Sequence, residues 1–162
     1  MMRESSTRRL PMALSSLVGL ALTVVPLPDA LDPFRPDFLV LVVIYWCIEN
    51  PRAGGLTLAF VAGLALDVLN GVVLGQHALA LTLMAAWATH LRLRIRVFSL
   101  LSQCLTLFAL LTGYQFVLFW VDGATGNPVT TFGRWLAPLV GALLWPLVDA
   151  ILGRMSTESR RV

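Results

Sequence analysis

The stretch Val97–Val121, VFSLLSQCLTLFALLTGYQFVLFWV, is 25 residues long, carries no charge and decides the fold. A membrane-spanning helix needs about 20 mostly apolar residues to cross a hydrocarbon core about 30 Å thick. The whole chain agrees, because 57% of its residues are hydrophobic and 13% are charged, against roughly 25% charged residues in a soluble domain. This composition excludes a disordered chain and leaves too few polar side chains to cover a soluble enzyme. It predicts an all-α membrane protein.

Five further apolar ranges predict a polytopic helical bundle that forms one integral membrane domain, residues 1–162. The first range follows three arginines but no cleavage site, so it is interpreted as an uncleaved span. The second has only 11 uncharged residues, Phe38–Ile48, and crosses only if the bilayer thins or neighbours cover its ends. The short step at Gly75–His77 predicts a tight hairpin. The six predicted spans are 10–27, 37–49, 54–74, 78–91, 97–121 and 133–153.

The arginines predict the orientation of these spans. All twelve cationic side chains are Arg, and six spans place all of them except Arg35 and Arg134 on the side of the N-terminus. Cytoplasmic loops carry an excess of Arg and Lys, so we expect both termini in the cytoplasm and a multi-pass membrane protein. Five spans would put either the stretch 92–96 or the C-terminal arginines outside. No loop is long enough for a separate domain.

Small residues at four-residue spacing predict a packing face on the third span. Gly55, Gly63, Gly71 and Gly75 lie on this ridge, and the last two form a GxxxG motif. Small side chains let helix backbones approach closely, which is the main packing device in lipid. The ridge fits either packing within the bundle or contact with a partner helix.

Asp67 lies on the same ridge and is the acidic residue deepest in a predicted span. A charge near the bilayer centre costs about 3 kcal/mol on insertion scales, so this side chain must point into the bundle or be protonated. It fits a polar pin between helices, a proton relay, a ligand contact, or a neutral acid that donates one hydrogen bond. Asn70 lies three residues further on and could share its polar contacts.

Catalytic and metal motifs are missing from the sequence. There is no Gly-x-Ser-x-Gly, no His-Glu-x-x-His and no P-loop, and a lone acid is not an active site. His77 and His90 are 13 residues apart, about 20 Å along a helix, and Cys47 and Cys104 are isolated in apolar runs. We therefore expect a protein that is not an enzyme and has no metal, cofactor or disulfide. The sequence contains no basic patch interleaved with aromatic residues, which is the pattern that would suggest nucleic-acid binding.

A basic turn is predicted between the fourth and fifth spans. Arg92, Arg94 and Arg96 alternate there with Leu and Ile. On the cytoplasmic face they would bind anionic lipid headgroups, at about 1 kcal/mol each, or a cytoplasmic partner protein.

Three segments resemble one known family. They are R-P-D-F-L-V-L-V-V-I-Y-W, residues 35–46, with E-N-P-R at 49–52; G-L-A-L-D-V-L-N-G, residues 63–71; and L-G-Q-H-A-L, residues 74–79. Together they resemble MreD, a family of small integral-membrane rod shape-determining proteins. The motifs cover residues 35–79, and from Leu91 onward the resemblance rests on topology.

The resemblance implies a non-enzymatic scaffold in the bacterial inner membrane, part of the machinery that elongates rod-shaped bacteria and builds their lateral peptidoglycan. The implied partners are MreC, and, directly or through MreC, the filament protein MreB, the glycosyltransferase RodA and the elongation transpeptidase. It also implies helices like those of the S subunits of energy-coupling-factor transporters. The alternative is therefore a membrane module that binds a lipid or small molecule, with Asp67, Asn70 and the Gln76–His77 turn lining an outward-facing pocket.

Overall fold

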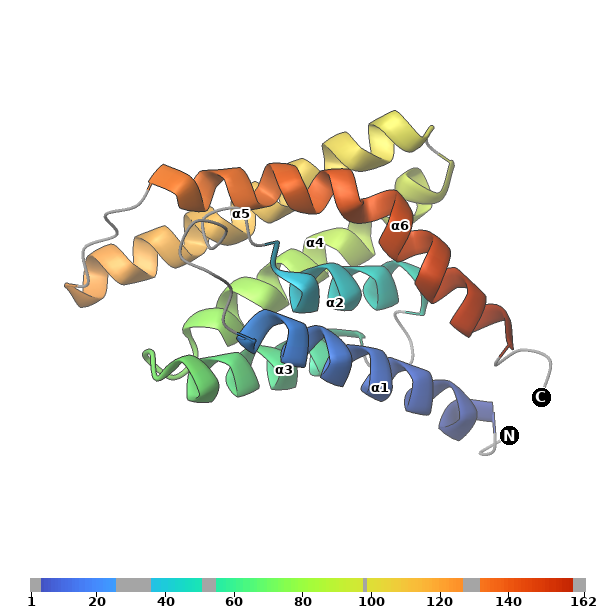
Figure 1. Cartoon of the computed structure of the whole chain (residues 1–162), viewed down its shortest axis with the longest axis horizontal. Coiled ribbons are helices and arrows are strands. Elements are labelled where there is room, and N and C mark those ends of the chain that lie inside the picture. Colours follow the sequence, from blue (N-terminus) through green and yellow to red (C-terminus); the bar gives the residue numbers. More distant parts are fainter. Residues whose placement is uncertain (1–3, 26–35, 51–54, 98, 127–131, 159–162) are drawn as a thin grey trace.

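Helices make up nearly all of the residues that the computed structural model describes, namely 4–25, 36–50, 55–97, 99–126 and 132–158 (Figure 1). These residues contain no strand, which confirms the all-α prediction. Each predicted span corresponds mainly to one α-helix, in the predicted order. The helices are α1 (Glu4–Val24), α2 (Phe38–Glu49), α3 (Gly55–Asn70), α4 (Gln76–Val97), α5 (Leu100–Thr125), the 3-10 helix η3 (Phe132–Leu136) and α6 (Ala137–Glu158).

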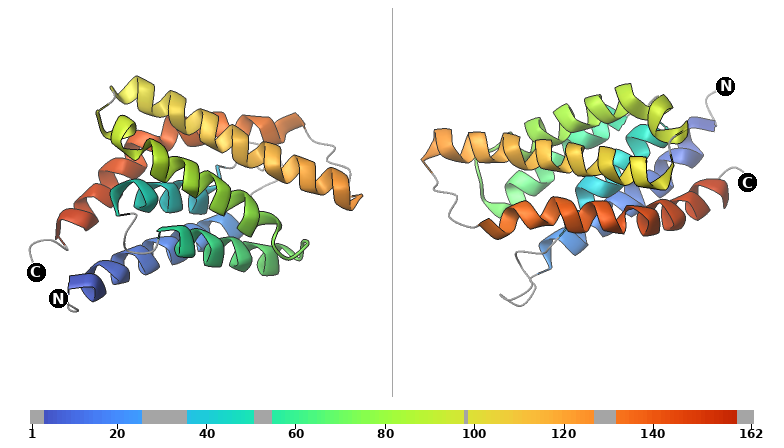
Figure 2. Two further views of the ribbon diagram at one scale, coloured as in Figure 1. Left: turned by 180° about the vertical axis from the view of Figure 1, so that it is seen from behind. Right: turned by 90° about the horizontal axis from the view of Figure 1, so that it is seen from above.

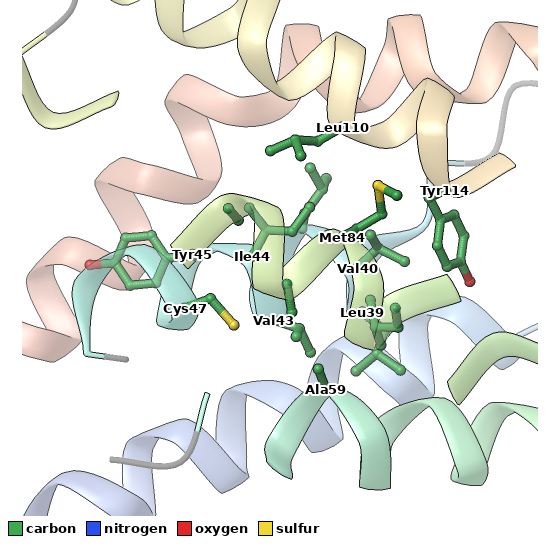
Figure 3. Close-up of a cluster of buried hydrophobic side chains, with 14 of the residues drawn as sticks. Leu39, Val40, Val43, Ile44, Tyr45, Cys47, Ala59, Met84, Leu110 and Tyr114 are labelled. Carbon is green, nitrogen blue, oxygen red and sulfur yellow. The ribbon is translucent and has the colours of Figure 1, made fainter. Parts of the chain in front are cut away.

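The short helix α2 lies at the centre of the bundle. Nine of its 12 residues are buried, because α1, α3, α4 and α6 all pack around it. Figure 3 shows the α2 side chains Val43 and Ile44 among neighbours that include Ala59 of α3 and Leu110 of α5. A helix that is apolar on every side is found in a protein core or within a bilayer. Neighbouring helices thus cover the segment that is too short to cross a bilayer by itself.

The bundle has two ends, and the chain passes between them with each helix. The start of α1, the α4–α5 junction and the end of α6 lie at one end, here called the terminus end (Figures 1 and 2). The α3–α4 connection and the end of α5 lie at the opposite end, here called the hairpin end.

Two helices of the described chain are long and apolar enough to cross a membrane, Leu100–Thr125 and Gly133–Ser156. Three further apolar helices of the described chain are shorter, at Leu10–Val24, Phe38–Glu49 and Gly55–Asn70. Cys47 and Cys104 are free thiols.

Two predicted boundaries were wrong. Helix α3 ends at Asn70 instead of continuing to residue 74, because Gly71 adopts a left-handed φ of +63°, a conformation that ends helices. Helix α4 continues to Val97, because 91–97 contains neither Gly nor Pro to stop it. Arg92, Arg94 and Arg96 therefore lie on the last turns of a helix, and the predicted basic turn does not exist.

Candidate functional site

Helices α3 and α4 approach each other most closely at Gly63. A Cβ atom built on Gly63 would lie 2.3 Å from the Cα of Ala78, so the backbones meet without a side chain between them. Gly55, at the start of α3, lies against Cys47 of α2 in the same way, with its Cβ position 3.1 Å from the sulfur. The absence of a side chain at Gly63 thus brings the start of α4 beside the second half of α3.

Gly71 and Gly75 have a different place from the one predicted. Both lie in the connection after α3, with φ of +63° and +102°, and a Cβ on either would meet nothing within 4 Å. Their placement on a helical packing ridge was therefore wrong. They allow the chain to reverse within a few residues, because only glycine adopts such positive φ values without strain.

This reversal places the carboxylate of Asp67 at the N-terminus of α4. Its Oδ1 accepts a hydrogen bond from the backbone N–H of His77 at 2.7 Å, and its Oδ2 accepts from the N–H of Gly75 at 2.8 Å and of Ala78 at 3.4 Å. The ring Nδ1 of His77 lies 2.9 Å from Oδ1. The first N–H groups of a helix have no partner within it, and negative charge is favoured there. Asp67, with 0% of its surface exposed, therefore caps the neighbouring helix.

A second set of polar side chains surrounds this cap. Asp122 of α5 accepts hydrogen bonds from Gln76 Nε2 and, at 2.7 Å, from an Arg134 terminal nitrogen. Arg134 Nε donates to Gln115 Oε1 at 2.7 Å, and Gln115 Nε2 donates to Asp37 Oδ2 at 2.9 Å. Gln76, Gln115 and Asp122 are 4%, 5% and 8% exposed. Buried polar groups of this kind are costly unless they are hydrogen-bonded, and these groups satisfy one another.

The two sets meet at the start of α4, where Gln76 and His77 are neighbours and the His77 ring faces the buried ring of Tyr114, with 6.4 Å between centroids. Together they connect the start of α2, the end of α3, the start of α4, helix α5 and η3. We call this set the hairpin-end network. It consists of Asp37, Asp67, Gln76, His77, Gln115, Asp122 and Arg134.

The hairpin-end network consists of groups that hold helices together by hydrogen bonds. Its amide, guanidinium and carboxylate groups bond each other across five elements, and its members are mostly buried. Within the described residues, no group of three or more His, Cys, Asp or Glu side chains is placed to hold a metal ion.

The remaining predicted site residues lie outside the network. Asn70 is exposed at the end of α3 and is not a donor to Asp67. Arg92 is half-buried and Arg94 is exposed near the terminus end, while the side chain of Arg96 lies outside the described residues. Asp67 itself lies in the last turn of α3, which ends at Asn70. It is therefore nearer the end of its helix than the predicted span 54–74 implied.

Sequence reasoning missed most of the network. It did not pair Asp122, directly after the predicted span 97–121, with Arg134, at the start of the predicted span 133–153, and it did not single out Gln115, a polar residue inside a long uncharged run. Opposite charges at the two ends of one short connection were the available signal for the first pair. The Gln115–Asp37 contact joins residues 78 positions apart, and no local pattern indicates it.

Comparison with known proteins finds the same family that the motifs in residues 35–79 resemble. The family model for rod shape-determining protein MreD matches residues 5–155. A similar curated protein is the rod shape-determining protein MreD of Haemophilus influenzae, which is 28% identical over 142 residues, with 86% of each chain covered. No solved structure matches the chain.

Proposed function

Because this chain belongs to the MreD family of rod shape-determining proteins, we propose that it is a non-enzymatic membrane scaffold of the bacterial cell-elongation machinery. It binds MreC and, directly or through MreC, connects MreB to RodA and the elongation transpeptidase. The observation that supports this most strongly is the hairpin-end network, whose polar groups hold helices together and are bonded to each other. Large apolar side chains, in contrast, stand exposed on the outer helices.

We further propose six membrane crossings with both termini in the cytoplasm. In support, the start of α1 and the end of α6 lie at one end of the bundle. The basic last turns of α4 lie at that end too, which agrees with the excess of arginine on cytoplasmic faces. Helix α2, at 12 residues about 18 Å long, and helix α3, at 16 residues about 24 Å long, are shorter than the hydrocarbon core. Neighbouring helices cover α2.

Accessibility labelling tests this topology. Single cysteines at Arg94 and Asn70, in a chain whose two native cysteines are replaced by serine, should react with a membrane-impermeant thiol reagent from opposite sides. Arg94 should react only in inverted vesicles and Asn70 only in intact spheroplasts. Reaction of both positions from the same side would overturn the six-crossing topology.

The partner-binding face is testable on the exposed apolar residues. Cysteines at Leu83 and Trp87 on α4, at Leu101 and Leu105 on α5 and at Leu143 on α6 all replace exposed side chains. A scaffold predicts that crosslinks to MreC in membranes concentrate on one of these faces. Crosslinking at none of them, in a chain that is folded and inserted, would count against a direct scaffold role.

The alternative of an outward-facing ligand pocket receives less support. It requires Asp67, Asn70 and the Gln76–His77 turn to line an open cavity together. Asp67 is fully buried and accepts hydrogen bonds from the start of α4, Gln76 donates to Asp122, and Asn70 is exposed.

A further inference from the structure

An apolar groove runs between α1 and α6, with α2 as its floor. Its volume is about 310 Å³, and its walls include Leu14 and Val18 of α1, Val42 of α2, and Val148 and Met155 of α6. Helices α1 and α6 both pack on α2 but contact each other little. Figure 1 shows the two helices apart from each other. Exposed side chains such as Val18, Leu147 and Ile151 form its rim, so the groove opens sideways to the bilayer.

The length of the groove corresponds to one leaflet. The lining residues of α1 extend from Leu14 to Leu22 and those of α6 from Leu144 to Met155. At 1.5 Å per residue these segments are about 12 Å and about 16 Å long. The hydrocarbon core is about 30 Å thick, so the groove spans about half of it.

The lining and length of the groove indicate its occupant. Its lining side chains are apolar apart from Ser15, and it is about 16 Å long. A hydrocarbon chain of one leaflet matches both, because it brings no polar group that such walls would leave unpaired.

Charge at the mouth of the groove indicates the headgroup. Arg154 lies on α6 three residues after Ile151 and seven after Leu147, so it continues their row on the helix by one turn, and it is exposed. Arginine suits phosphate as a planar fork of donors.

We propose that this groove binds one acyl chain of an anionic membrane phospholipid, whose headgroup lies at the terminus end beside Arg154. The lipid fills the space between α1 and α6 and fixes their separation. The proposal requires the chain to lie in a membrane, but it does not depend on MreC or on the scaffold role.

The test uses the full chain in nanodiscs that contain phosphatidylglycerol with a photoreactive diazirine in its acyl chain. Peptide mapping after illumination should find the label concentrated on 14–22 and 144–155. The double variant Val18→Phe/Val148→Phe fills the groove from both walls. It should reduce this labelling roughly tenfold, the loss expected when about two methylene groups are no longer buried.

The matched control is Val61→Phe/Val68→Phe, which makes the same change at two exposed positions of α3 and should leave the labelling unchanged. Arg154→Gln should reduce the preference for anionic over zwitterionic lipid roughly fivefold, as expected for one Arg near a charged headgroup. Labelling spread evenly over all exposed helices would overturn the proposal. So would labelling of the groove that the double variant does not reduce, or crosslinks that show a partner helix seated in the groove.

Discussion

At the scale of single residues, the central observation is that Asp67 is bonded to the backbone of the next helix. A carboxylate in a membrane segment is usually functional, as a relay or a ligand contact. Here its oxygens accept from three N–H groups at the start of α4, which gives the charge a structural reason. A buried acid thus fixes the position of one helix start relative to the helix before it.

Replacing Asp67 by alanine should lower the free energy of unfolding by roughly 2–4 kcal/mol, because at least two buried N–H donors would lose their acceptor. Asp67→Asn keeps one acceptor oxygen and should cost about half as much. Thermal unfolding of purified protein in detergent measures both. Asn70→Ala, an exposed change in the same turn, should stay within about 0.5 kcal/mol. Equal stability of Asp67→Ala and Asn70→Ala would contradict the capping role.

Two adjacent serines on α1 should respond in opposite directions. Ser15 Oγ accepts a hydrogen bond from Trp46 Nε1 at 2.8 Å, whereas Ser16 Oγ is buried without a hydrogen-bond partner among the described residues. Each residue is 7% exposed. Ser15→Ala should lower the free energy of unfolding by about 1–2 kcal/mol, and Ser16→Ala should raise it by up to about 1 kcal/mol. Unfolding curves recorded side by side decide this, and a loss of the same size in both would show the assignment to be wrong.

At the scale of elements, the α3–α4 hairpin depends on glycine at two kinds of position. Gly63 permits close approach of the two backbones, while Gly75 permits a backbone angle that other residues adopt only with strain. At Gly63 there is no space for a side chain. At Gly75 there is space, but the positive φ is one that residues with a side chain rarely adopt. Together they bring the N-terminus of α4 to Asp67.

Gly75→Ala should therefore lower the free energy of unfolding by about 1–2 kcal/mol through backbone strain, although space around it is open. Gly123 in α5 is the matched control, because it also has no atom within 4 Å but keeps a helical backbone. Gly123→Ala should raise stability by up to about 1 kcal/mol. Comparison of the two variants by thermal unfolding isolates the free energy lost through the positive φ at Gly75. Destabilisation of equal size at both positions would contradict a role for this backbone angle.

The number and order of the helices could be predicted, since long uncharged runs such as 97–121 have no other stable state in lipid. The end of α3 could not, because Gly71 fits both a GxxxG ridge and a left-handed helix end, and sequence spacing alone does not choose between them. Within the candidate site, Asp67 was identified as unusual from its apolar surroundings. Its actual partners, backbone N–H groups, have no sequence signature, and Gln115 and Arg134 are joined only by the tertiary fold.

At the scale of the whole molecule, polar side chains cluster at the hairpin end, and apolar side chains cover much of the outside. Helix α2 supplies the apolar centre and the hairpin-end network fastens the helices around it. The outer helix faces are available to lipid and to partner proteins, and the proposed function is to bind such partners. Loss of a network residue should then act on function only through the amount of folded protein.

The most direct test places network variants in rod-shaped cells whose own MreD-family gene is deleted. For Asp67→Asn, Gln76→Ala, Asp122→Asn and Arg134→Gln, the length-to-width ratio of the cells is measured together with the amount of folded, membrane-inserted protein. The scaffold account predicts that all variants fall on one curve, with rod shape restored in proportion to folded protein, as for wild-type protein titrated by expression. A variant that accumulates folded protein at the wild-type level and still recovers MreC, yet leaves the cells round, would contradict it.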